Sequence, residues 1–141
     1  MYKNVMKLNF SAISENESFA RVAVAAFVGR LNPTLAEVME IKTAVSEAVT
    51  NAIIHGYEGM TGDLMVELSC RINGNEVFVE IADTGRGIAD IEKAREPMYT
   101  SKPEMERSGM GFTVMEEFMD EIEIVSQDGK GTTIRLKKVI K

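Results

Sequence analysis

The sequence predicts a two-layer α+β sandwich, in which helices cover one face of a mainly antiparallel sheet. Three observations favour this fold class. One strand pattern and two helical patterns fill the first half of the chain. Two alternating stretches are then joined by Asn73-Gly74-Asn75, which is a typical hairpin turn. Two further strand patterns close the chain around Asp128-Gly129, and strands joined by short turns pair antiparallel.

Length and composition favour one ordinary globular domain that spans residues 1–141. The chain has 141 residues, of which 45% are hydrophobic and 27% charged. No apolar stretch approaches the ~20 residues that cross a membrane as a helix. The first residues, MYKNVMKLNF, lack the apolar segment of a signal peptide. We therefore expect a cytoplasmic protein without a membrane span.

Charge and cysteine content exclude several kinds of site. The net charge of −6 argues against general nucleic-acid binding, which needs a basic face, and leaves room for a protein partner. Cys70 is the one cysteine and His55 the one histidine, too few for a disulfide or a Cys/His zinc site. We expect Cys70 to be a small apolar strand residue.

The first strand and helix follow from alternation and from end signals. Val5–Phe10 alternates like a half-buried strand, and Ser14 with Glu17 then matches a capping box that opens a helix. Asn32-Pro33 ends this helix. Its apolar residues at helical spacing are Phe19, Val22, Ala23, Ala26 and Phe27. Polar residues on the other side, Glu17 and Arg21, are candidates for a surface that meets protein partners, although a solvated helix face is an equal alternative.

The second helix has clear signals at both ends. Thr34 and Glu37 repeat the capping-box pattern, and Gly56 stops the helix after His55. The predicted core stripe comprises Val38, Ile41, Val45, Ala48, Val49 and Ala52.

A polar edge runs beside this core stripe. It comprises Ala44, Glu47, Asn51 and His55, at spacings of about four. Glu47 and Asn51 therefore point the same way. Polar groups at the border of a core need partners, so the edge is either solvated, with a Glu to Asn hydrogen bond, or part of a ligand site. We give His55 no catalytic role, because a lone histidine at a helix end is more often a capping group.

The second half of the chain contains a hairpin, a long loop, a helix and two strands. The hairpin strands are expected at Leu64–Ile72 and Glu76–Ala82. Asp83–Arg107 follows as a long loop with one short helix around Ile88–Arg95, and loops of this length are usually functional or mobile. The remaining elements are expected at Gly111–Met119 as a helix and at Glu121–Ser126 and Thr132–Val139 as strands.

Two glycine clusters flank the long loop. Asp83-Thr84-Gly85-Arg86-Gly87 follows a strand directly, where glycines permit positive φ and the close approach of a ligand. A turn in which Asp83 acts as a local cap is the alternative. Ser108-Gly109-Met110-Gly111-Phe112 opens a helix, and the exposed amides there favour an anion. Neither cluster matches a P-loop or a Rossmann fingerprint, so each alone is weak evidence.

Taken in order, these features resemble the GHKL superfamily of ATPases and kinases. The ordered set is the helix with Glu47 and Asn51, then DTGRG, a polar loop, SGMGF, and Gly131-Thr132-Thr133. The resemblance covers nearly the whole chain and implies the Bergerat type of ATP-binding sandwich with bound ATP or ADP. It also implies that Asn51 holds Mg²⁺ and that Asp83 binds the adenine amino group. Glu47 is then placed to accept the proton of an incoming hydroxyl.

The same resemblance assigns the remaining residues of the nucleotide site. They are Gly85, Gly87, Lys102, Arg107, Ser108, Gly109, Gly111, Thr132 and Thr133. The glycines after residue 108 offer amides to the phosphates, and the cationic residues of the loop offset charge on the transferred group. A threonine hydroxyl, from Thr132 or Thr133, supports the adenine side.

Within the superfamily, three stretches resemble anti-sigma factors that are also protein kinases. They are ENESFARVAVAAF, SEAVTNAIIHGY and TSKPEMERSGMGF. This resemblance implies a homodimer that binds a sigma factor of the F type and phosphorylates a serine of a STAS-domain anti-anti-sigma factor. Two alternatives are a sigma-binding module that uses nucleotide without catalysis and an ATPase domain like that of histidine kinases. The latter normally works on a histidine carried by a separate helical segment, for which this chain has no room.

Overall fold

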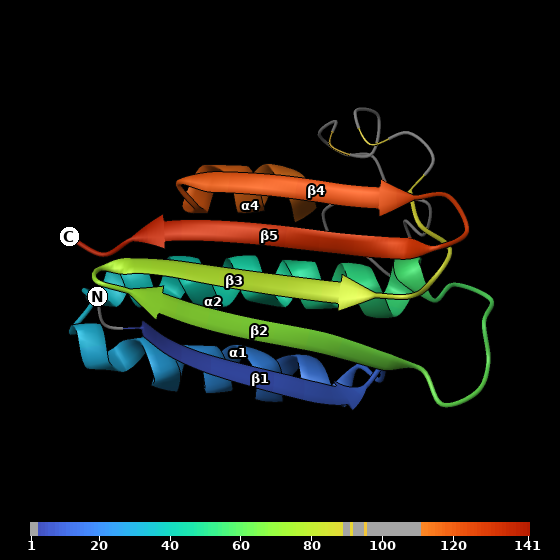
Figure 1. The fold of residues 1–141 in the computed structure, drawn as a ribbon, viewed down its shortest axis with the longest axis horizontal. Coiled ribbons are helices and arrows are strands. Elements are labelled where there is room, and N and C mark those ends of the chain that lie inside the picture. Colours follow the sequence, from blue (N-terminus) through green and yellow to red (C-terminus); the bar gives the residue numbers. More distant parts are fainter. Residues whose placement is uncertain (1–2, 89–90, 92–94, 96–110) are drawn as a thin grey trace.

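One antiparallel sheet organises the part of the chain that the structure describes. The computed structural model describes residues 3–88, 91, 95 and 111–141. Its strands are β1 (Lys3–Ser11), β2 (Met65–Asn73), β3 (Glu76–Asp83), β4 (Glu121–Gln127) and β5 (Gly131–Val139). They are ordered β1-β2-β3-β5-β4, and each pairs antiparallel with its neighbours (Figure 1). The predicted strands and fold class are confirmed.

Helices cover one face of this sheet. They are α1 (Glu15–Val28), α2 (Leu35–Thr50) and α4 (Gly111–Phe118), with a 3₁₀ turn η1 (Gly29–Leu31) and a π-helical turn η2 (Asn51–Gly56). In Figure 1 the helices lie behind the strands, and α2 packs against both α1 and α4. None of the described helices is long and apolar enough to cross a membrane.

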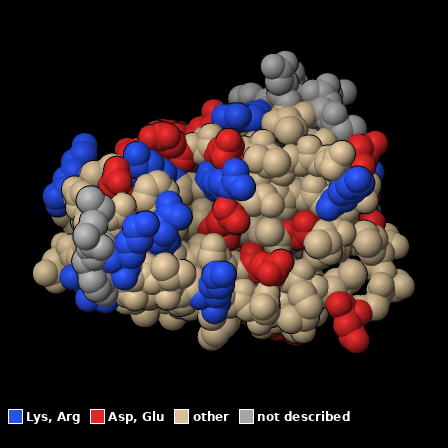
Figure 2. Space-filling view, viewed as in Figure 1, with Lys and Arg blue, Asp and Glu red and all other residues tan. Residues whose placement is uncertain are grey.

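The other face of the sheet is open and carries charged side chains of both signs (Figure 2). Arg135 of β5 pairs with Glu80 at 2.8 Å and with Glu123 at 2.9 Å across the neighbouring strands. Lys137 likewise lies 3.3 Å from Glu76 and 3.2 Å from Glu121. Strand alternation therefore separates a polar, solvated face from the face that holds the core.

The core lies between the sheet and the helices. Strand residues that point to the helices are almost fully buried, namely Val66, Leu68, Cys70, Ile72, Val77, Val79, Ile81, Ile134 and Leu136. Cys70 is among them, as expected, and burial raises the pKa of its thiol to about 12.

Helix α2 begins as the sequence predicts. Thr34 Oγ1 accepts a hydrogen bond from the Glu37 amide at 3.1 Å, and Glu37 Oε1 accepts one from the Thr34 amide at 2.8 Å. Both halves of the capping box are therefore present. Asn32, with φ of 51°, ends η1 in the left-handed conformation, so the predicted stop before α2 is confirmed.

The capping box predicted at the start of α1 is wrong. Ser14 makes no side-chain cap and already has helical backbone angles, with φ of −57° and ψ of −33°. Backbone turns satisfy the first amides instead, because Asn16 donates to the Ile13 carbonyl at 3.0 Å and Glu17 to the Ser14 carbonyl at 3.2 Å. The hydroxyl therefore has no amide left to cap.

The predicted buried face of α1 is also wrong. Phe19 and Val22 are 55% and 54% exposed, while Ala20, Val24 and Val28 face the core. Apolar residues surround this helix, so its pattern does not choose a face, and packing against the sheet does. Glu17 and Arg21, expected on the solvated side, lie in the partly buried zone instead: Glu17 Oε2 and Arg21 Nε are 3.5 Å apart and shielded from water.

The polar edge of α2 differs in two places from the prediction. Ala44 is fully buried in the core, whereas Val38 of the predicted core stripe is only half-buried. The helix also does not continue to His55 as an α-helix, because its last turn is the π-helical η2. Gly56 closes this turn and is followed by Tyr57, so the predicted end position is confirmed.

The second half of the chain follows the predicted order where it is described. Gly74, with φ of 64°, turns the hairpin between β2 and β3. The predicted helix at Ile88–Arg95 lies mostly outside the described residues, although the Arg95 amide donates to the Ile91 carbonyl at 3.1 Å.

Candidate functional site

Asp83, the DTGRG loop, Thr132 and the η2 turn lie together at one end of the sheet. There β3 ends at Asp83, β5 begins at Gly131, and η2 contacts both strands (Figure 1). Asp83 and Thr132 are opposite each other in the β3–β5 register, and both are buried on the face that the helices cover. Thr133 lies on the open face, so the structure brings only Thr132 to the side of Asp83.

Asp83 is a buried carboxylate, only 8% exposed. Burial raises its pKa, and hydrogen bonds from the backbone of Gly85 and Thr132 oppose that rise. The Gly85 amide donates to Oδ1 at 2.9 Å. A carboxylate offers about four acceptor positions. A neutral ligand with an N–H donor, such as an adenine amino group, therefore fits this side chain.

Glycines allow the carboxylate to sit where it does. A Cβ at Gly56 would lie 2.8 Å from the Cγ and both carboxylate oxygens of Asp83. A Cβ at Gly85 would lie 1.8 Å from the Gly56 carbonyl oxygen, which accepts the Arg86 amide at 2.7 Å. The end of η2 and the DTGRG loop thus touch backbone to backbone. Gly87 has a φ of 77°, the positive value that the glycines of this loop are predicted to permit.

Two residues that the sequence interpretation did not single out fix this loop. The Tyr57 hydroxyl donates to the Met65 carbonyl at 2.6 Å and accepts the Thr84 amide at 2.9 Å. Ser126 Oγ accepts the Ile88 amide at 2.6 Å and lies 2.8 Å from Thr132 Oγ1. The place of Tyr57 directly after Gly56 is a signal for the first residue. Nothing in the sequence links Ser126 to the loop.

Glu47 and Asn51 lie where α2 passes into η2. Both side chains are half-buried, and the Asn51 amide donates to the carbonyls of Ala48 and Glu47 at the transition. Single π-helical turns inside helices occur frequently at functional sites. The π-helical turn begins at Asn51, so Glu47 lies in the last turn of α2 and Asn51 is the first residue of η2. His55, within the π-helical turn, is half-buried.

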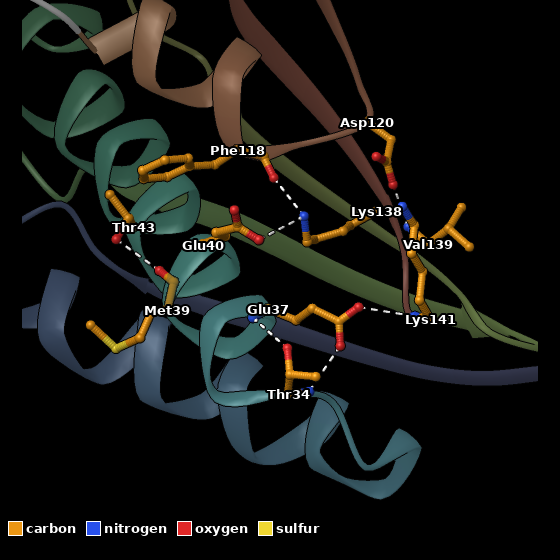
Figure 3. A network of polar contacts seen from close by, with 10 residues as sticks. All are labelled: Thr34, Glu37, Met39, Glu40, Thr43, Phe118, Asp120, Lys138, Val139 and Lys141. Carbon is orange, nitrogen blue, oxygen red and sulfur yellow. Dashed lines mark hydrogen bonds and ion pairs between the residues drawn. The ribbon is translucent and has the colours of Figure 1, made fainter.

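Helix α4 runs antiparallel to α2, and its end at Phe118 lies beside the first turns of α2 (Figure 3). Its eight residues span about 12 Å, which brings its start at Gly111 toward the level of Glu47. Four other predicted residues, Lys102, Arg107, Ser108 and Gly109, lie outside the described residues.

Asn51 is the candidate metal ligand of this site. Among the described residues, no three His, Cys, Asp or Glu side chains gather as an all-protein metal site requires. Mg²⁺ commonly takes one or two protein ligands together with phosphates and water, and the side-chain oxygen of Asn51 fits that pattern.

A hollow of about 620 Å³ lies away from this site, on the open face of the sheet. Its lining includes Arg71, Phe78, Arg135 and Lys137, and Arg71 stacks on the Phe78 ring at 4.4 Å from the centroid. Since Arg135 and Lys137 pair with carboxylates that line the hollow and none of the predicted site residues lines it, we do not assign the chemistry to it.

Known proteins support the same interpretation. The sequence profile of the histidine kinase-like ATPase domain matches residues 10–138. The chain is 55% identical over 139 residues to the anti-sigma F factor of Thermoanaerobacter sp. strain X514, covering 99% of this chain and 96% of the relative. It is 58% identical over 139 residues to the anti-sigma F factor of Clostridium kluyveri, with coverage of 99% and 96%. With that of Anoxybacillus flavithermus it shares 60% identity over 136 residues, or 96% and 92% of the chains.

Solved structures share the fold at low identity. The RsbU and RsbW domains of a Mycobacterium tuberculosis protein superpose with a TM-score of 0.66 at 19% identity, over 97% of this chain and 32% of that chain. The histidine kinase domain of a blue-light activated kinase from Erythrobacter litoralis gives a TM-score of 0.58 at 16% identity, over 88% and 60%. The chain therefore belongs to the family of histidine kinase-like ATPase domains, in the branch that the anti-sigma F factors form.

Proposed function

We propose that this chain is an ATP-dependent serine-protein kinase that also binds a sigma factor of the F type. One observation carries the nucleotide part: the buried Asp83 carboxylate, held by the Gly85 amide and pressed against Gly56, retains acceptor positions for a ligand. The names of the relatives carry the sigma-factor part. The kinase substrate is a STAS-domain anti-anti-sigma factor.

ATP or ADP binds with its adenine at Asp83. The carboxylate accepts the adenine amino group in a charge-assisted hydrogen bond, with Thr132 beside it. Gly111, at the start of α4, directs the positive end of the helix dipole toward the phosphates. Gly109 and Ser108 contribute amides there, and Lys102 and Arg107 offset charge on the transferred phosphoryl group.

Glu47 is the general base of phosphoryl transfer. The serine oxygen of the partner forms a bond to the γ-phosphorus of ATP while the bond from that phosphorus to the β,γ-bridging oxygen breaks, and the serine proton goes to the Glu47 carboxylate. Asn51 would hold Mg²⁺, which neutralises charge on the phosphates when bound. ADP and the phosphoserine partner are the products.

The partners define the biological role. We expect a homodimer of this single domain, residues 1–141, acting in the cytoplasm. Glu17 and Arg21 of α1 are retained as candidate partner contacts, because the exposed part of the Arg21 guanidinium can pair with a partner carboxylate. The sigma factor and the anti-anti-sigma factor would then compete for binding to this protein.

One experiment tests the kinase and its alternatives together. Purified protein is incubated with radiolabelled ATP, Mg²⁺, an F-type sigma factor and a STAS-domain anti-anti-sigma factor, and label transfer and complex formation are measured. We expect transfer to serine, and a loss of about 10²–10⁴-fold in rate for Glu47→Gln with ATP binding retained. Nucleotide-dependent sigma binding without transfer would favour the non-catalytic module, and acid-labile label on histidine would favour the histidine-kinase alternative.

A further inference from the structure

Lys138 occupies a position where the strand pattern predicts an apolar residue. It follows Ile134 and Leu136 on the face of β5 that the helices cover, and it is only 8% exposed. A buried ammonium group is costly unless it is paired and hydrogen-bonded. The mechanism proposed above gives this residue no part, so its retention in the core needs a reason.

The partners of Lys138 come from two helices (Figure 3). Its Nζ donates to the carbonyl oxygen of Phe118, the last residue of α4, at 2.7 Å. The same Nζ lies 3.2 Å from Glu40 Oε1 in α2. A cation at a helix C-terminus is stabilised by the helix dipole, so the contact to Phe118 is favourable as well as satisfied. Lys138 thus joins β5, α4 and α2 at one point.

Glu40 lies on the same side of α2 as the predicted catalytic residues. Glu47 and Asn51 follow it by seven and eleven residues, which are about two and three helical turns. The side of α2 that Lys138 ties to α4 therefore also carries Glu47 and Asn51. Helix α4 has only eight residues, so a shift of its end at Phe118 carries over to Gly111 at its other end.

Other contacts of α4 define its position along α2 less specifically. Glu116 pairs with Arg95 at 2.9 Å, but both side chains are partly exposed, and such pairs contribute little in solvent. The apolar residues Phe112 and Met115 of α4 are buried in the core, but apolar packing is non-directional. The Lys138 contacts are directional, and the Lys138 side chain itself is buried although Glu40 is partly exposed, so the hydrogen bond to Phe118 fixes how far α4 extends along α2.

We propose that Lys138 is a positioning residue for nucleotide phosphates: it sets the place of the α4 N-terminus relative to Glu47 and Asn51. This inference rests on the proposed function, because it assumes that the start of α4 faces the phosphates. Lys138 does not touch the nucleotide. Its loss is expected to weaken contacts to the phosphates and to leave contacts to the adenine, which Asp83 makes, unchanged.

The test compares a ligand with phosphates and a ligand without them. Dissociation constants for Mg·ATP and for adenosine are measured on the full chain by calorimetry and by NMR titration, for wild type and Lys138→Met. We expect Mg·ATP to bind about tenfold more weakly to Lys138→Met and adenosine to bind as in wild type. General loosening of the core would weaken both ligands equally, and that outcome would overturn the proposal.

Matched variants keep the test decisive. Lys137→Met removes one charge from the neighbouring residue, which pairs with Glu76 and Glu121 on the open face, and should leave both ligands at wild-type affinity. If Lys138→Met does not fold, Glu40→Gln breaks only the ion pair at a side chain that is 36% exposed, and should weaken Mg·ATP about threefold without affecting adenosine. Wild-type affinity for Mg·ATP in both Lys138→Met and Glu40→Gln would refute the positioning role of Lys138 and leave the proposed function standing. A wild-type protein that bound no ATP would instead refute the proposed function.

Discussion

Gly56→Ala perturbs the contact on which the nucleotide proposal depends. The new methyl carbon would lie 2.8 Å from the Cγ and both oxygens of Asp83. Nonbonded carbon contacts are ordinarily about 3.5–4.0 Å, so the carboxylate or the η2 turn must move by about 0.7 Å or more. Gly56 does not need a positive φ, so the backbone itself tolerates alanine. The variant therefore displaces the Asp83 carboxylate without changing its chemistry.

The structure sets the expected size of both effects. Overpacking of this kind costs about 1–3 kcal/mol, and the lower entropy of the unfolded alanine chain offsets about 0.4–1 kcal/mol of it. The net cost is therefore at most about 2.6 kcal/mol, and at about 3 °C per kcal/mol for a chain of this size Tm should fall by up to about 8 °C. A hydrogen bond to a charged group is worth about 1.5–3 kcal/mol, so a misplaced Asp83 should weaken ATP binding by about 10- to 150-fold.

Gly29→Ala is the matched control. A Cβ at Gly29 has no atom within 4 Å, and its φ of −53° suits alanine. Thermal unfolding and ATP calorimetry on the two variants at equal concentration make the comparison. Gly29→Ala should match wild type in ATP affinity. If Gly56→Ala bound ATP as tightly as Gly29→Ala, Asp83 would not be the adenine contact.

Three further predictions concern single groups. Burial raises the folded-state pKa of Asp83, so ionisation of this carboxylate destabilises the ligand-free protein as pH rises above 3.8. Asp83→Asn should therefore raise Tm at neutral pH and weaken ATP binding about 10- to 150-fold, and a lower Tm would contradict this. Hydrogen bonds from the amides of Lys141 and Thr34 lower the pKa of Glu37, so the ionised carboxylate stabilises the fold above pH 4.5 and this stabilisation is lost as pH falls through the folded-state pKa. The difference in free energy of unfolding between wild type and Glu37→Gln should therefore shrink in acid, as urea unfolding at several pH values would show. With a pKa of about 12 and full burial, Cys70 should resist a thiol reagent in the native state and react only on unfolding, so labelling as fast as in urea would show that β2 opens locally.

Most of the fold could be predicted because its signals are local. The capping box at Thr34, the hairpin turn at Gly74 and strand alternation each act over a few residues, so the sequence states them directly. The face of α1 could not be predicted, because apolar residues lie all round the helix and only docking on the sheet selects Ala20, Val24 and Val28.

The candidate site divides in the same way. Glu47, Asn51, Asp83 and the glycines were recognisable from residue type, spacing and order along the chain. The contacts that place them are long-range, and no local pattern encodes them: Gly56 meets Asp83 and the Gly85 loop, Tyr57 holds Thr84, and Lys138 joins two helices. The sequence by itself determined which chemical groups are available and which elements carry them. Tertiary structure alone decided which face of each helix is buried and which groups meet, because burial and close contact depend on segments far apart in the chain.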